Sequence, residues 1–82
     1  MTTDARTWID AFAEALGVDA LTEDEVEILL ELAGTAAHGS ERKAAPLSCW
    51  LAARSGLTPA EAEVRARELA ERLAGAEVSP ED

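Results

Sequence analysis

Two helix start signals of the same form divide this chain of 82 residues. Thr22 precedes Glu25 by three residues, and Thr58 precedes Glu61 by the same spacing. This spacing allows a capping box, in which each side chain bonds the backbone N–H of the other residue at the first turn of a helix. The sequence therefore predicts an all-α fold. Glycines suited to helix ends follow the helical stretches, namely Gly17, Gly39, Gly56 and Gly75.

Apolar residues recur at helical spacing between these signals. The pattern predicts a compact four-helix bundle with helices over about residues 4–16, 23–38, 46–55 and 59–74. Pro46 suits the first position of the third helix, and Gly34 is expected at a close helix crossing. Trp8 and Trp50 are expected to anchor the core, with Leu47 on the same side of the helix as Trp50. The prediction is one helical domain over residues 1–75, followed by an acidic, disordered tail over residues 76–82.

Alanine makes up much of the hydrophobic fraction of the chain. It occupies 18 positions in a sequence that is 48% hydrophobic and has two tryptophans, one phenylalanine and no tyrosine. Because alanine buries little area, such a core depends on close helix approach around a few large side chains. A domain of this size is only marginally stable alone. The sequence therefore favours a protein partner and leaves self-association into a homo-oligomer open.

Charge and apolar patterning exclude several settings. The formal net charge of −10 repels nucleic acid and anionic membrane surfaces. No apolar run is long enough to span a bilayer, and the start Met1-Thr2-Thr3-Asp4 lacks the basic region of a secretory signal. Cys49 is the single cysteine, so no intramolecular disulfide can form. These features predict a cytoplasmic protein.

The residues needed for catalysis or metal binding do not cluster in the sequence. The single histidine, His38, lies eleven residues from Cys49, whereas a metal site needs several converging ligands. No glycine-rich phosphate loop is present. Ser40 and Ser48 both lack the Asp-Ser-Leu motif on which acyl carrier proteins, also small, acidic and helical, carry their prosthetic arm. We therefore expect no catalytic residue, no metal site, no cofactor and no enzyme activity.

Cationic groups gather in residues 38–54, where the local net charge is +2. His38 falls in the last turn of the second predicted helix, and Arg42 and Lys43 precede the third. Because helix N-termini bind anions through free N–H groups, these three residues form a candidate anion site. Alternatively, Arg42 and Lys43 are solvated or pair with nearby acids while His38 caps its helix, or the segment docks a protein. Trp50 is expected in the core, but an exposed Trp50 would mark a partner-binding site.

Three stretches of the chain carry a family resemblance. They are Trp8-Ile9, the run Leu-Ala-Gly-Thr-Ala-Ala-His-Gly over residues 32–39, and Arg42 followed by Ala-Ala-Pro-Leu over residues 44–47. In these stretches, and over about residues 5–74, the chain resembles a short actinobacterial domain of unknown function. That domain occurs alone or fused to the C-terminal side of MobA-type molybdenum cofactor guanylyltransferases. Lys43 stands where the family has proline, and Trp50 where it usually has phenylalanine.

Two functional hypotheses follow from the residues and the resemblance. The first is a non-catalytic accessory domain linked to molybdopterin-guanine dinucleotide (molybdenum cofactor) biosynthesis. Its partner would be the guanylyltransferase or an anionic ligand held near residues 38–47. The alternative is an acidic protein–protein interaction module with no small-molecule ligand, whose first two helices face a basic partner.

Overall fold

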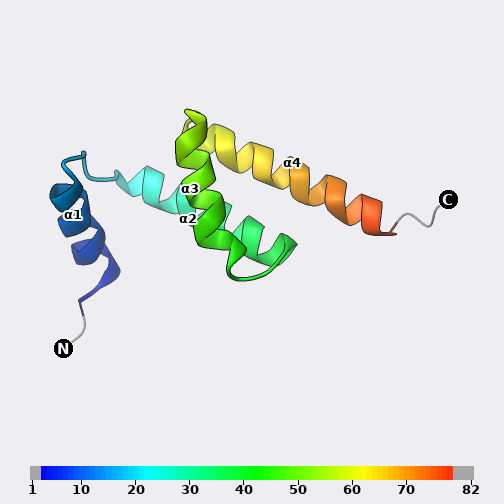
Figure 1. The fold of residues 1–82 in the computed structure, drawn as a ribbon, viewed down its shortest axis with the longest axis horizontal. Coiled ribbons are helices and arrows are strands. Elements are labelled where there is room, and N and C mark those ends of the chain that lie inside the picture. Colours follow the sequence, from blue (N-terminus) through cyan, green and yellow to red (C-terminus); the bar gives the residue numbers. More distant parts are fainter. Residues whose placement is uncertain (1–2, 79–82) are drawn as a thin grey trace.

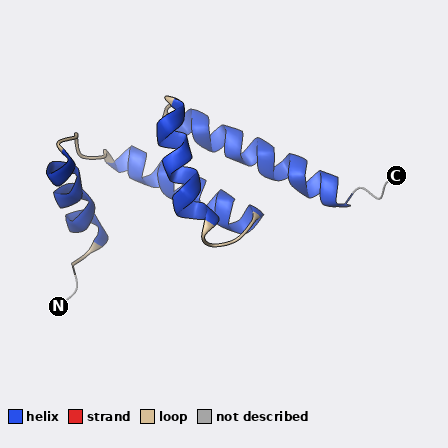
Figure 2. Cartoon of the chain, viewed as in Figure 1, coloured by secondary structure: helices blue, strands red, loops and turns tan. Residues whose placement is uncertain are grey.

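A computed structural model describes residues 3–78 of the chain, with side chains as far as residue 75. Four helices follow one another, and no strand occurs in that range (Figure 1, Figure 2). The prediction of an all-α fold with four helices is confirmed. The helices are α1 (Ala5–Leu16), α2 (Glu23–Gly39), α3 (Ala44–Ser55) and α4 (Pro59–Val78).

The capping signals of the sequence set most of the helix ends. Thr22 Oγ1 accepts the Glu25 N–H at 3.0 Å, and Glu25 Oε1 accepts the Thr22 N–H at 2.8 Å. Thr58 and Glu61 repeat this reciprocal pair at the start of α4, with distances of 3.0 and 3.2 Å. After α1 and α3 the chain turns through glycines in the left-handed region, with φ of 75° and 80°. Local chemistry therefore determines where the helices begin and end.

The predicted ends of α3 and α4 differ from the observed ones. α3 begins two residues before Pro46, because a turn through residues 41–45 leads directly into the helix. α4 continues through Gly75 to Val78, so the predicted stop and the predicted start of the tail are both wrong. The last part of the expected tail, residues 79–82, lies outside the described residues.

α2 approaches another helix at Gly39 and not at Gly34. A Cβ atom added to Gly39 would lie 3.5 Å from the Cβ atom of Ala70, whereas one added to Gly34 would meet no atom within 4 Å. Gly39 is also the last residue of α2, and the chain leaves the helix at Ser40. The expected role of Gly34 is therefore wrong, and the end of α2 approaches α4 at Gly39.

Helix α2 is the platform of the fold. α3 and α4 both pack on α2 but scarcely on each other, and the C-terminal half of α4 extends away from α3 (Figure 1). The Cα atoms of α1 lie more than 8 Å from those of every other helix. α1 is attached through the linker at residues 17–22, where the Arg6 guanidinium donates to the Leu21 carbonyl.

The buried core is small. Only Leu32 among the large apolar side chains of the described residues is buried, together with Ala13 and Ala62. Trp8 is 60% exposed and Trp50 67% exposed, so the expectation that both anchor the core is wrong. The physical reason lies in α3, where the small side chains of Ala45, Cys49 and Ala52 are half-buried and the large ones point outward. Small residues let helix backbones approach closely, and α3 uses that face against α2.

The capping box at the start of α2 gives a first prediction. Replacing Thr22 with alanine removes the acceptor for the Glu25 N–H and should lower the free energy of unfolding by about 1 kcal/mol. Urea unfolding followed by circular dichroism measures the change. Thr22→Asp is the matched control, because aspartate also accepts at an N-cap and should retain most of the stability. Equal losses in both variants would contradict a capping role.

Candidate functional site

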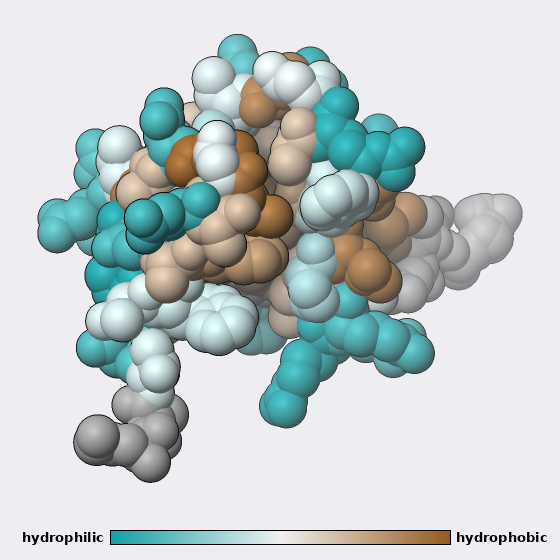
Figure 3. Space-filling view, turned by 60° about the vertical axis from the view of Figure 1, so that its left-hand side comes forward, coloured by the Kyte–Doolittle hydropathy of each residue, from teal (hydrophilic) through white to brown (hydrophobic). Residues whose placement is uncertain are grey.

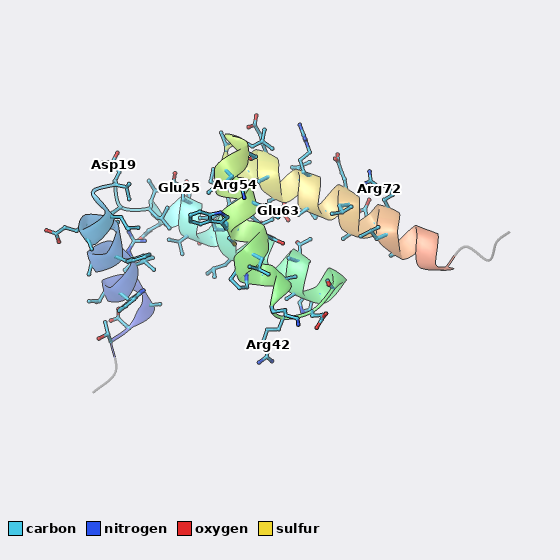
Figure 4. The ribbon with its side chains drawn as sticks, viewed as in Figure 1. Asp19, Glu25, Arg42, Arg54, Glu63 and Arg72 are labelled. Carbon is cyan, nitrogen blue, oxygen red and sulfur yellow. The ribbon has the colours of Figure 1, made fainter. Side chains whose placement is uncertain are left out.

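The three residues of the predicted anion site are all exposed. His38 is an exposed residue in the last turn of α2, and Arg42 and Lys43 lie in the turn before α3. The Arg42 side chain points away from the body of the molecule (Figure 4). A shallow hollow does lie beside them, lined in part by Gly39 and Ser40, but none of the three cations lines it. The structure therefore does not gather these side chains around a shared concavity.

The N-terminus of α3 also has few amides to offer an anion. The N–H of Ala44 donates to the Glu41 carbonyl at 2.9 Å, and the N–H of Ala45 donates to the Arg42 carbonyl at 3.1 Å. The third residue is Pro46, which has no N–H. Because anion sites at helix N-termini depend on free N–H groups, this start of a helix lacks their main feature. The anion site stays a prediction without support from this geometry.

The outward side of α3 has the character of a protein-binding surface. Leu47, Trp50 and Arg54 recur at i, i+3 and i+7, so they lie on one side of the helix. All three are exposed, with Trp50 two-thirds accessible to solvent. We call these three residues the α3 outer face. The exposure of Trp50 meets the condition stated above for a partner-binding site. Arg54, labelled in Figure 4, marks where the α3 outer face lies on the helix.

Nucleophilic catalysis would depend on Cys49, and metal binding on a cluster of ligating side chains. Cys49 is half-buried against the helix platform, and this burial raises the pKa of its thiol and disfavours the thiolate nucleophile. No group of three or more His, Cys, Asp or Glu side chains able to hold a metal ion occurs among the described residues. Of the helices seen in residues 3–78, none combines the length and apolarity needed to cross a membrane.

Sequence reasoning missed Glu63, the one charged side chain among the buried residues described. It is 7% exposed on α4, where its carboxylate accepts from Thr35 Oγ1 at 3.3 Å and from Arg67 Nε at 2.8 Å. The hydrogen bond from the guanidinium, followed by the charge of Glu63, raises the pKa of Arg67. A signal was present, because Glu63 shares the helical spacing of Ala66 and Ala70. It is a structural link between α2 and α4.

The comparisons with known proteins identify a family. The model described as "Domain of unknown function (DUF6457)" matches residues 1–80. The chain belongs to this family. No curated protein matches the chain, and no solved structure matches it. Membership in DUF6457 confirms the coarser part of the resemblance, a small domain of unknown function.

The α2–α4 link predicts a measurable effect on stability. Thr35→Val keeps the shape of the side chain but removes the hydroxyl that donates to the buried Glu63 carboxylate. We expect the free energy of unfolding to fall by about 1 kcal/mol, because a buried acceptor loses a partner. Urea unfolding measures it. Thr35→Ser, which keeps the hydroxyl, should retain more stability than Thr35→Val, and the reverse order would exclude the hydrogen bond as the cause.

Proposed function

We propose that this protein is a non-catalytic binding domain that docks on a protein partner through the α3 outer face. The observation that carries the proposal is the exposure of Trp50, which is 67% accessible beside an equally open Leu47. A folded domain gains nothing in stability from a tryptophan left in water. Tryptophan and arginine are also the residues most enriched among those that dominate binding energy at protein interfaces.

The charges around this face indicate the chemistry of its partner. Residues 38–54 carry a net charge of +2 within a chain of −10, and Arg54 lies directly on the face. An apolar patch with a guanidinium at its edge is complementary to an apolar patch bordered by carboxylates. A basic partner, as in the acidic-module alternative, would be repelled here and would instead need the acidic helices α1 and α2.

The resemblance narrows the partner to a molybdenum cofactor guanylyltransferase of the MobA type. In the fused proteins that this chain resembles, the two domains are joined in one polypeptide. Here the domain would dock on the transferase and assist molybdopterin-guanine dinucleotide synthesis without chemistry of its own. The α3 outer face supplies a candidate surface for that contact.

Isothermal titration of this protein against the purified guanylyltransferase of the same organism tests the proposal. Trp50→Ser should weaken binding about 30-fold or more, the effect typical of a hot-spot residue. Leu30→Ser is the matched control, because Leu30 on α2 is also 67% exposed but lies outside the α3 outer face. It should bind like the unaltered protein.

Three results would overturn parts of this proposal. Equal losses in the Trp50 and Leu30 variants would show that general apolarity, and not this face, carries the binding. Binding that ignores Trp50 and weakens steeply with salt would favour the acidic module. If the titration gives no heat of binding and no complex forms at micromolar concentrations, the guanylyltransferase is excluded as the partner.

A further inference from the structure

The chain exposes more surface than a closed domain of its size. Its accessible surface is 6560 Å², whereas a folded monomer of 8.7 kDa exposes about 4,700 Å². Its radius of gyration is 15.1 Å, against about 11.7 Å for a compact domain of this length. Such an open arrangement leaves large apolar side chains exposed, among them Trp8, Phe12 and Leu69.

Part of this surface is the apolar stripe of α1. Trp8, Phe12 and Leu16 follow one another at i, i+4 and i+8, and each is at least half exposed. The rings of Trp8 and Phe12 are stacked, with their centroids 6.1 Å apart, so they form one continuous apolar surface. α1 packs on no other helix, and its stripe has no partner within the described chain.

A second open surface is the groove between α3 and α4. Both helices pack on α2 but scarcely on each other. Two adjoining hollows lie between them; these share Ser48, Ala66 and Leu69 in their linings, which also include residues of α2. We call them together the α3–α4 groove. On the side of the molecule that Figure 3 views, hydrophobic residues also lie exposed among hydrophilic ones. The lining of the groove includes Leu32, Ala36, Ser48, Leu51, Ala66 and Leu69.

The α4 wall of the groove is as long as α1. This wall runs from Ala62 to Leu73, twelve residues or about 18 Å of helix, and α1 is a helix of twelve residues. An amphipathic helix with anchors at i, i+4 and i+8 is the usual occupant of such an apolar groove. One chain therefore has an apolar stripe on α1 that packs on no other helix, and an apolar α3–α4 groove that no helix fills.

We infer that two copies of this chain form a reciprocal dimer, in which α1 of each copy lies in the α3–α4 groove of the other. This inference goes beyond the proposed function, because it uses different side chains from the α3 outer face. The contact is self-complementary, so two copies close into a twofold dimer with no groove left open. It covers both unpartnered surfaces at once.

Charge favours this pairing. α1 and its N-cap residue Asp4 together hold three acids and one base, a net of −2. Residues 38–75, which hold both walls of the groove, carry six bases and five acids, a net of +1, and Arg65 lies on the groove lining. Placing the acidic end of one copy on the more basic end of the other reduces like-charge repulsion between two chains of −10.

The chain's own α1 is less well placed to fill the groove. α1 is attached at the start of α2, and Arg6 holds it to the Leu21 carbonyl there. The groove lining reaches Leu73 in the C-terminal half of α4, and this half lies on the opposite side of α3 from α1 (Figure 1). The connection between α3 and α4, residues 56–58, closes the near end. A second copy meets no such constraint.

Sedimentation equilibrium of the full chain gives the first test. We expect a species of twice 8.7 kDa at micromolar concentrations, with helicity unchanged on dilution. In a Trp50→Phe background, Trp8 emission should shift to the blue as the dimer forms, because its ring leaves water. A monomer at all concentrations would overturn the inference, whether α1 folds back onto its own groove or stays open.

Charge substitutions on the two sides separate a reciprocal contact from other dimers. Phe12→Asp on α1 and Leu69→Asp in the groove should each raise the dissociation constant about 30-fold or more. Mixing the two variants should give a heterodimer that is tighter than either variant's own dimer but weaker than the unaltered dimer. One of its two contacts pairs an unaltered α1 with an unaltered groove, whereas the other contact carries both substitutions. Leu30→Asp and Trp50→Ser are the controls and should both leave the dimer intact.

Three outcomes of the Phe12→Asp and Leu69→Asp experiment count against the reciprocal contact. A dimer that survives Leu69→Asp would be formed by α1 against α1, and one that survives Phe12→Asp would be formed by groove against groove. Loss of the dimer in both variants with no recovery on mixing would also overturn it, provided circular dichroism shows both chains folded. Loss of partner binding in Trp50→Ser with the dimer intact would separate this inference from the proposed function.

Discussion

The close approach of α3 and α4 to α2 is the contact on which the rest of the structure depends. It is made largely by small side chains, with Leu32 as the one large apolar residue buried among those described, and Gly39 lies close to Ala70 of α4. Small residues let backbones come together but bury little apolar area. Since the close contacts use the small faces of the helices, the large apolar side chains remain outside, and they form the surfaces through which this domain would act.

The helix ends could be predicted from the sequence because they depend on neighbours within a few residues. Thr22 and Thr58 form the expected capping boxes, and Gly17 and Gly56 take the left-handed conformation expected of helix ends. The buried faces could not be predicted in the same way. α3 is apolar on two sides, with large residues around Trp50 on one and small residues on the other. Helical periodicity identifies an apolar side but does not decide which of two is buried.

The predicted anion site depended on which N–H groups are free at the start of α3, and the residue types alone do not reveal this. Arg42 and Lys43 precede a helix start, as expected, but the turn they form uses the first amides of α3, and Pro46 supplies none. A helix beginning at Pro46 would have left different N–H groups free. For Glu63 the sequence shows the residue itself but not its partner. A carboxylate at the helical spacing of buried alanines can be recognised in the sequence. Its partner Thr35 lies 28 residues away and is known only once α2 and α4 are packed.

The two proposed surfaces are compatible in one assembly. A dimer joined through α1 and the α3–α4 groove leaves Leu47, Trp50 and Arg54 of each copy uncovered, because these residues do not line the groove. Such a dimer presents two identical docking faces related by a twofold axis. A partner that is itself dimeric could engage both faces, and the second contact would then form at high effective concentration. Modest affinity at each α3 outer face would in that case suffice for a stable complex. This suits a face that has a single exposed tryptophan and only two further residues to contribute to binding.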